Sequence, residues 1–178
     1  VPVRVLKGLY AGNTFLGDSS GNPIVAISMG TFHSSALAAD GKMYTWGANI
    51  FGQLGDGTVT QRLTPVRTLK GVYLGASFLG DDAANPIVSI AGAGNHNTAI
   101  TKDGFVFSFG YNNAGQLGDS TTVDRKVPVR VRKGAYNGTK YLGDNPANPI
   151  IAVSAGENHS MALAADGTVY SFGLNNYG

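Results

Sequence analysis

Cysteine is absent from this sequence of 178 residues, and charged residues are scarce. Without cysteine the chain can form neither disulfides nor thiolate metal sites. Charged residues make up 13%, against a usual quarter, and Glu157 is the only glutamate. The net charge of +2 is too small to predict a nucleic-acid-binding surface. No apolar run reaches the roughly 18 residues that a membrane span requires, so neither nucleic acid nor a bilayer is an expected partner.

Glycine and apolar residues are plentiful instead. The chain has 26 glycines, and 43% of its residues are hydrophobic, which excludes a disordered charged tail. Its acids are almost all aspartates. Because aspartate and glycine favour turns whereas glutamate favours helix interiors, the composition predicts a turn-rich, all-β protein.

An internal repeat of 63 residues runs through the sequence. Pro2-Val3-Arg4, Pro65-Val66-Arg67 and Pro128-Val129-Arg130 mark its successive starts. Aligned without a gap, residues 65–115 and 128–178 are identical at 26 of 51 positions. The chain therefore divides into repeats 1–64, 65–127 and an incomplete 128–178, about 2.8 copies, which we expect to be parts of one domain.

Each copy contains four strand-like runs. In the first copy these are the alternating residues 3–5, the apolar residues 24–27, and residues 33–38 and 43–46, which flank an Asp-Gly turn. No segment has a sustained helical period. Four short antiparallel strands per unit are typical of β-propeller blades, and the complete units fall at about 24–67 and 87–131. The predicted fold is an all-β propeller of four-stranded antiparallel blades.

Three short motifs carry a resemblance to a known family. They are Gly30-Thr-Phe-His33, Asp40-Gly41 with Trp46-Gly47, and Gly52-Gln-Leu-Gly-Asp56, and later copies retain them. They resemble the repeat of the regulator of chromosome condensation (RCC1-like) family. The resemblance implies a seven-bladed propeller when complete, and guanine-nucleotide exchange on a small GTPase as the activity of the founding member. The long insert described next indicates a bacterial type of this family.

An insert follows each Pro-Val-Arg run, at residues 7–23, 70–86 and 133–149. Its frame is Lys-Gly-x-Tyr-x-Gly, then Phe or Tyr before Leu-Gly-Asp, then Asn-Pro. We expect a small hairpin on the blade edge. Such a hairpin would lie on one face of the propeller, where insertions usually provide binding surfaces.

Residues that recur in every copy are interpreted as scaffold. Each histidine is expected to bond the backbone at the adjoining turn and so join the first two strands of its blade, and each Asp-Gly aspartate to stabilise its turn. Three histidines around a metal are the alternative. No nucleophile or carboxylate pair stands out, so no catalytic residue, cofactor or metal ligand is predicted. The recurring set is His33, His96, His159, Asp40, Asp103, Asp166, Trp46, Phe109 and Phe172.

Two further recurring patterns have competing interpretations. Asp18, Asp81 and Asp144 open the loops that end in Asn-Pro, and we interpret them as turn caps, with calcium binding as the alternative. The basic residues that recur near the fourth strand, among them the arginines of the Pro-Val-Arg runs, are interpreted as edge-strand charges that resist aggregation, with contact to phosphate as the alternative.

Specificity is predicted where the copies differ beside turns. A mixed aromatic and amide rim suits contact with a protein or a glycan better than chemistry. The predicted function is a non-enzymatic binding or scaffold module for a protein or surface ligand. Guanine-nucleotide exchange and a glycan-binding, adhesin-like surface protein are the alternatives. The candidate contacts are Phe32, Asn95 and Asn158; Ala48, Tyr111 and Leu174; and Phe51, Ala114 and Tyr177.

The chain is expected to be part of a larger assembly. Residues 1–6 supply a fourth strand alone and residues 150–174 supply three strands, whereas propellers use roughly four to eight blades. We expect either further repeats in a longer chain or a second copy that forms a six-bladed ring by exchanging the Pro-Val-Arg strand. A bacterial extracellular or cell-surface location would suit insert-bearing repeats without cysteine.

Overall fold

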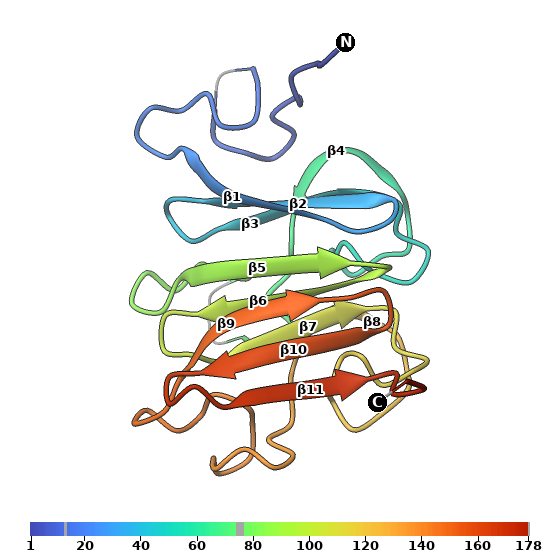
Figure 1. Cartoon of the computed structure of the whole chain (residues 1–178). Helices are drawn as coiled ribbons and strands as arrows, with labels where there is room; N and C mark the ends of the chain where they lie inside the picture. The colour runs from blue at the N-terminus through green and yellow to red at the C-terminus, as the bar shows by residue number, and fades with distance from the viewer. Residues whose placement is uncertain (13, 74–76, 178) are drawn as a thin grey trace.

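The computed structural model describes residues 1–12, 14–73 and 77–177 (Figure 1). These residues form eleven β-strands and no helix, which confirms the all-β prediction. The same residues accordingly offer no apolar helix of membrane-spanning length. Gly75 of the second insert and the terminal Gly178, both part of recurring motifs, lie outside the described residues.

The strands form three antiparallel sheets that follow one another along the chain and are called blades 1, 2 and 3 here. Neighbouring strands in each sheet are consecutive in sequence. Blade 1 comprises β1 (Ile24–Met29), β2 (His33–Ala38), β3 (Met43–Gly47) and β4 (Arg62–Arg67). Blade 2 comprises β5 (Ile87–Ala93), β6 (His96–Thr101), β7 (Val106–Gly110) and β8 (Arg125–Arg130). Blade 3 comprises β9 (Ile150–Ala155), β10 (His159–Ala164) and β11 (Val169–Gly173).

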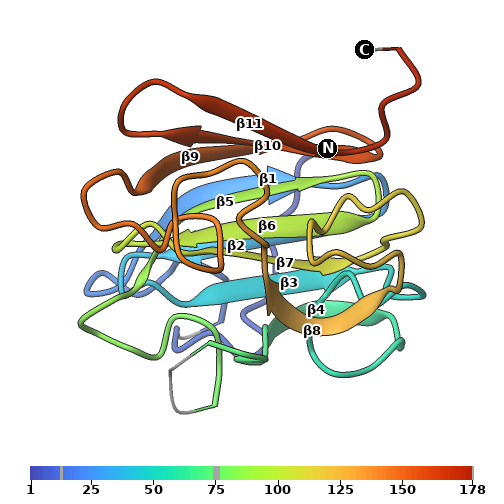
Figure 2. The same cartoon turned by 90° about the horizontal axis from the view of Figure 1, so that it is seen from below.

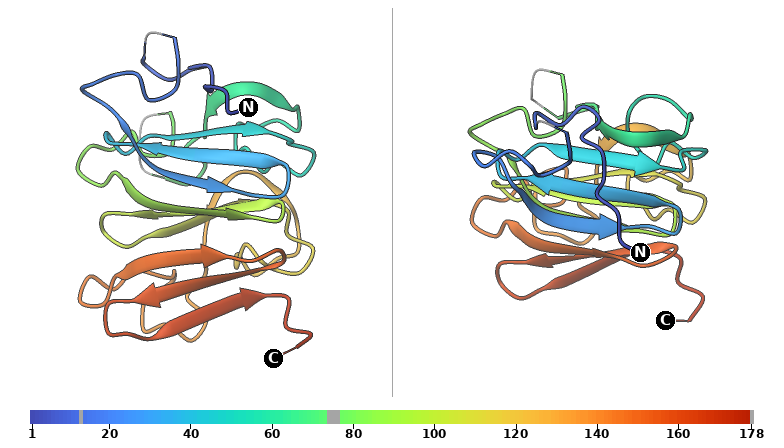
Figure 3. Two further views of the ribbon diagram at one scale, coloured as in Figure 1. Left: turned by 45° about the horizontal axis from the view of Figure 1, so that its top comes forward. Right: turned by 90° about the horizontal axis from the view of Figure 1, so that it is seen from above.

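The blades are stacked face to face, as in a propeller (Figures 2 and 3). Strand β5 contacts both β1 and β9, and these three strands form the inner edge, while β4 and β8 are the outer strands. Each sequence repeat therefore begins with the last strand of one blade and continues into the next blade. Because the boundary of each repeat falls inside a blade, each repeat contributes strands to two neighbouring blades.

The apolar core lies between the blades. One cluster, which includes Leu37, Met43, Ile87 and Phe107, fills the junction of blades 1 and 2. A second cluster, centred on Ile100, Val106 and Ile150, fills the junction of blades 2 and 3. At about 25 cal/mol per Å² of buried apolar surface, this packing is the main attraction that holds one blade on the next.

The Asp-Gly hairpins are the most regular turns. Leu37 pairs with Met43 at the end of β2 and β3, and the Asp40 carboxylate accepts the backbone N–H of Lys42 at 3.2 Å. Gly41 has a φ of +82°, and a Cβ there would lie 2.3 Å from the Cβ of Pro86 at the start of blade 2. Glycine is thus required both by the turn and by the close approach of the next blade.

The first Pro-Val-Arg run is not a strand, which corrects the prediction for residues 3–5. Val1 and Val3 are exposed, whereas β4 and β8 extend over six residues each. The physical reason is pairing: Val66 lies opposite Thr45 of β3, and no described strand lies beside residues 3–5 in the same way. Without a partner strand, the same residues have no ladder to join.

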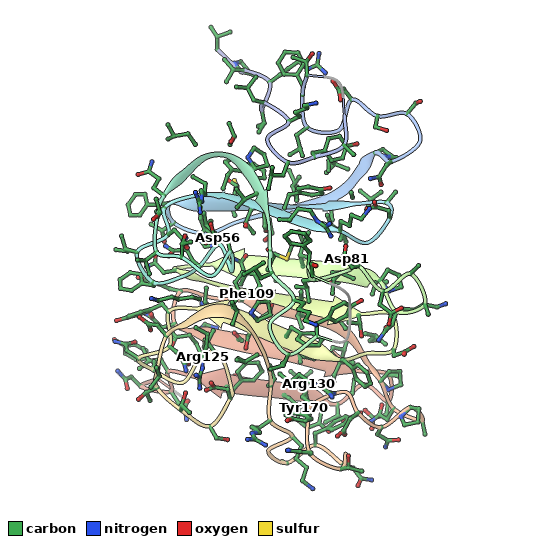
Figure 4. The ribbon with its side chains drawn as sticks, turned by 180° about the vertical axis from the view of Figure 1, so that it is seen from behind. Asp56, Asp81, Phe109, Arg125, Arg130 and Tyr170 are labelled. Carbon is green, nitrogen blue, oxygen red and sulfur yellow. The ribbon has the colours of Figure 1, made fainter. Side chains whose placement is uncertain are left out.

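The inserts lie at the hairpin end of the blades, called the insert face here. Instead of a regular hairpin, each insert contains one isolated bridge, for example Leu6 opposite Phe15. Tyr73 of the second insert is buried, and its ring meets Phe107 edge-on with 5.5 Å between centroids. The inserts are therefore fastened to the blades. In Figure 4 the labels of Asp81, Arg130 and Tyr170 lie toward this end of the strands.

The opposite end of the blades is called the loop face here. It carries the turns between the first two strands and the long loops 48–61 and 111–124 that join the third strand to the fourth. The labels of Asp56 and Arg125 in Figure 4 lie toward this end.

Candidate functional site

A hollow of about 470 Å³ opens on the loop face across both blade junctions. All three blades contribute side chains to it. Six of the nine predicted contact positions line it, together with Asn113 and Glu157. The lining residues are Phe51, Asn95, Tyr111, Asn113, Ala114, Glu157, Asn158 and Leu174.

Two aromatic rings form the blade 1 side of the hollow. Phe51 and Tyr111 come from the long loops of adjacent blades, and their ring centroids are 4.5 Å apart with planes inclined by 47°. Phe51 is held in place because its backbone N–H donates to Oε1 of the buried Gln53 at 3.0 Å. The same Gln53 amide donates to Asn95 Oδ1 at 3.4 Å. The rings therefore belong to a hydrogen-bonded wall that joins blade 1 to blade 2.

A buried asparagine shapes each long loop. Asn49 Nδ2 donates to Asp56 Oδ1 and to the carbonyl oxygen of Thr60, each at 3.1 Å, while Asn49 Oδ1 accepts the N–H of Leu54 at 2.9 Å. Asn112 makes the equivalent bonds in blade 2. Because a buried amide with all its partners holds distant backbone segments in one arrangement, the loop tips that line the hollow are preorganised.

An ion pair closes the base of each loop. Arg62 Nε donates to Asp56 Oδ2 at 2.7 Å, and Arg125 repeats the contact with Asp119. Burial alone would raise the pKa of Asp56, but hydrogen bonds from Thr58 and Arg62 outweigh burial and lower it. In their ionised form, these aspartates therefore hold the base of each loop together.

The histidines join neighbouring blades below the hollow. His33 Nε2 lies 2.9 Å from Asn97 Nδ2, and the same Asn97 amide donates to the carbonyl oxygen of Gln53 at 2.7 Å. This differs from the expected bond within one blade. The partner on the next blade lies 64 residues further on, so only the stacking of the blades brings the two together.

The second junction repeats this arrangement with a different partner. His96 Nε2 lies 2.8 Å from Ser160 Oγ, which donates to the carbonyl oxygen of Gln116 at 2.9 Å. Burial lowers the pKa of both His33 and His96 from 6.5 to about 4, so each ring is neutral at pH 7. A buried, hydrogen-bonded neutral imidazole is suited to a structural role. His159, at the same position in blade 3, is exposed.

Three predicted contacts lie elsewhere. Phe32 and Tyr177 are largely exposed and Ala48 is half-buried, and none of them lines the hollow. Tyr177 lines a neighbouring depression on blade 3, which shares Glu157, Asn158 and Leu174 with the hollow. Sequence comparison of the copies places these residues in equivalent positions, but only positions between two blades become walls of a shared hollow.

The prediction missed Glu157 and Asn113. Glu157 takes the place of Thr31 and Gly94 in the other copies, so the disagreement between copies was a usable signal. It was overlooked because Glu157 lies within a motif interpreted as scaffold. Asn113 corresponds to Ile50, another disagreement of the same kind.

The aspartates of the insert loops bind backbone. Asp81 Oδ2 accepts the N–H of Phe78 at 3.0 Å, and Asp144 Oδ2 accepts the N–H of Tyr141 at 2.9 Å. In Asp18 the same atom accepts the N–H of Phe15 at 2.9 Å. These bonds have the geometry of turn caps. Nowhere in residues 1–12, 14–73 and 77–177 do three His, Asp or Glu side chains meet in a group that could hold a metal ion.

Two of the three arginines of the Pro-Val-Arg runs, Arg67 and Arg130, are partly covered and do not face solvent as edge charges, whereas Arg4 is exposed. Arg67 pairs with Asp81 at 2.5 Å and lies 4.3 Å from the Phe78 ring, and both charged side chains are only 14% exposed. Arg130 lies between the rings of Phe105 and Tyr141, at 4.2 and 4.3 Å. The aggregation-resisting interpretation is wrong for these two, because the insert folds over the strand and covers the guanidinium.

Comparison with protein families gives one consistent match. The model of the regulator of chromosome condensation (RCC1) repeat matches residues 40–100 and 103–163. A second model of the same description matches residues 24–53 and 150–178.

Curated relatives share this region at about one third identity. The chain is 36% identical over 158 residues to the human probable E3 ubiquitin-protein ligase HERC3, which covers 87% of the chain and 13% of that protein. It is 35% identical over 147 residues to the zebrafish (Danio rerio) protein RCC2 homolog, covering 82% of the chain and 25% of the relative. Both relatives are vertebrate proteins and give no support to a bacterial type of the family. The chain spans only about an eighth to a quarter of these relatives.

Solved structures show the same fold. Human WBSCR16 superposes with a TM-score of 0.70 at 23% identity, over 92% of this chain and 37% of that one. RCC1 (Prp20) of the yeast Saccharomyces cerevisiae, solved with Kap60 bound, gives a TM-score of 0.62 at 27% identity, over 84% of this chain and 32% of that one. The predicted propeller architecture is thereby confirmed.

Proposed function

The chain belongs to the RCC1 repeat family, and on that premise we propose that it is a non-enzymatic binding module that holds a partner protein on its loop face. The observation that carries this proposal is the hollow itself. Side chains that differ between the copies converge there from three blades, while the residues common to the copies build the frame beneath them.

The chemistry of the hollow supports recognition of a protein. Its wall combines aromatic rings with side-chain amides, and aromatic residues are enriched in the cores of protein interfaces. The tips are also held before any partner arrives, because Asn49 and Asn112 fix the loops. Preorganisation of this kind reduces the entropy lost on binding.

The family relatives supply a precedent. The yeast RCC1 structure contains Kap60, and a second crystal structure of the same yeast protein is reported with its binding to Gsp1p and histones. A partner protein for the present chain is proposed by analogy with these complexes. The name of HERC3 refers to a protein of which this chain matches 13%, so its ligase activity is not proposed here.

A peptide selection tests the proposal. A random peptide library displayed on phage is selected on the immobilised chain, and the enriched peptides are measured against Tyr111→Ala. We expect at least tenfold weaker binding, because Tyr111 supplies half of the aromatic wall. Phe32→Ala is the matched control, since Phe32 is an exposed aromatic outside the hollow. Peptides that bind both variants like the parent, or no enriched peptide at all, would contradict the proposal.

Guanine-nucleotide exchange is the second candidate, carried by the likeness to yeast RCC1. It predicts faster release of labelled GDP from a small GTPase when the chain is added. Clear stimulation in a panel of GTPases would displace the binding-only proposal.

A further inference from the structure

We infer that the hollow takes a basic side chain, preferably arginine, from an extended segment of its partner protein. This inference rests on the function proposed above and names the chemistry that the hollow recognises.

The charge in the lining of the hollow favours a cation. Glu157 is the only charged residue in the lining, and it is exposed. Within the described residues it belongs to no ion pair: the pairs there involve Lys42, Arg62, Arg67 and Arg125 with aspartates. An unpaired carboxylate in a concave site concentrates negative potential there, although the whole chain carries a net charge of +2. A cationic group is its electrostatic complement.

The aromatic wall of the hollow also attracts cations. A cation over an aromatic face is attracted by the ring quadrupole, and the planar guanidinium adds stacking. This chain uses the same contact on its insert face, where Arg4 lies 4.0 Å from the Phe15 ring and Arg67 lies 4.3 Å from the Phe78 ring. Phe51 and Tyr111 offer the equivalent surface to a guanidinium that comes from outside.

Side-chain amides add hydrogen-bond acceptors to the hollow. Asn113 and Asn158 line the hollow, and their side chains make no hydrogen bond within the described part of the chain. Each carries a carbonyl oxygen that can accept from a cation. A guanidinium has five N–H donors in a fixed plane, so it can meet Glu157 and an amide oxygen together.

These features favour a basic side chain over a sugar. A neutral sugar would cover the Glu157 carboxylate without supplying a countercharge, which carries a desolvation cost. A hollow of about 470 Å³ is within the range that encloses a side chain with its flanking backbone.

The test is a double-mutant cycle on a selected peptide. Peptides enriched on the chain are expected to contain arginine or lysine more often than the starting library does. Replacing that arginine with citrulline, which has the same shape without the charge, is expected to weaken binding to the parent about tenfold. On Glu157→Gln the same replacement is expected to change the affinity less than about twofold, because the charge partner is gone.

Controls separate this inference from the proposed function. Asp103→Asn removes an exposed carboxylate on the insert face and should leave the tenfold difference intact. Raising the salt concentration should weaken the arginine peptide more than the citrulline peptide. Thermal melting of Glu157→Gln should match the parent, since this side chain is exposed.

The outcomes are distinguishable. Peptides that require Tyr111 but show no basic preference, or an equal loss with citrulline on Glu157→Gln, overturn the inference and leave the proposed function standing. A neutral oligosaccharide on a glycan array that binds through Tyr111 also overturns it. Failure to enrich any peptide that depends on Tyr111 removes the proposed function and this inference together.

Discussion

His33 Nε2 lies 2.9 Å from Asn97 Nδ2, across the junction between the first two blades. The contact joins residues 64 positions apart and is repeated 63 residues later by His96 and Ser160. One amide thus connects a histidine of one blade with the long loop of the same blade through the backbone of Gln53. The frame of the binding hollow and the packing of the blades are therefore one hydrogen-bonded structure.

Replacing His96 with alanine should destabilise the protein. The substitution leaves the buried Ser160 hydroxyl without one of its partners, at a cost of about 1–3 kcal/mol. Urea unfolding monitored by fluorescence measures the change. His159→Ala is the matched control, because His159 is exposed in blade 3 and should change stability by less than about 0.5 kcal/mol. Equal unfolding of His96→Ala and the parent would refute the junction role.

Stability should fall as the pH drops from about 6.5 to about 4. Burial lowers the folded-state pKa of His33 and His96 to about 4, while the unfolded chain titrates near 6.5. The unfolded state therefore binds more protons in this window and gains stability relative to the folded state as the pH decreases. The loss is on the order of 3 kcal/mol for each histidine.

Urea unfolding at several pH values between 7 and 4 measures this dependence. A His33→Gln, His96→Gln double variant should be less stable than the parent at pH 7 but nearly independent of pH in this window. The aspartates Asp56 and Asp119 have lowered pKa values, so their contribution is lost only at still lower pH. A parent whose stability stays constant down to pH 4 would contradict the prediction.

Replacing Asn112 with alanine should both destabilise the protein and deform the hollow. Asn112 is buried, and its amide donates to Asp119, Thr121 and Val123 while accepting from Leu117. Removing it leaves several buried backbone groups unpaired, for a loss of roughly 2–4 kcal/mol. The neighbouring Asn113 is exposed, so Asn113→Ala should melt like the parent. Similar melting of the two variants would show that the loop does not depend on this amide.

The isolated chain should self-associate through its uncovered blade faces. Ile27 is 75% exposed and Met29 is 70% exposed, whereas Ile90, the equivalent of Ile27 in blade 2, packs against the cluster between blades 1 and 2. Exposed apolar patches of this kind favour association. Light scattering should report a mass above 18.4 kDa, and Ile27→Glu should restore the monomer. Val59→Glu, on an exposed loop, is the control. A parent that stays at 18.4 kDa at every concentration would contradict this prediction.

Strand positions were predictable because the signals are local. The Asp-Gly turns lie between apolar runs, and the structure places β2 and β3 on either side of Asp40-Gly41, as predicted. Residues 3–5 show the limit of such signals. Val3-Arg4 repeats Val66-Arg67 at the end of β4, but a strand forms only where a partner strand can pair with it, and Val66 pairs with Thr45.

The candidate site was predictable only in part, for a related reason. Disagreement between the copies identified Phe51, Asn95, Tyr111, Asn158 and Leu174, which line one hollow. The same criterion also selected Phe32 and Tyr177, which do not line the hollow between the blades. Glu157 was overlooked because it lies within a recurring motif. The partner of His33 was not predictable, because no local rule relates it to a residue 64 positions away.

By itself the sequence determined the all-β class, the repeat, the turns and the family, since each depends on residues close together in the chain or on the comparison of copies. The tertiary structure alone decided which surface of each copy meets another blade. That choice paired His33 with Asn97, buried Arg67 beneath an insert, and brought Phe51, Tyr111 and Glu157 to one hollow. The physical reason is that burial and hydrogen bonding across a junction depend on the surfaces of two neighbouring blades. The sequence of one repeat describes only one of these two surfaces.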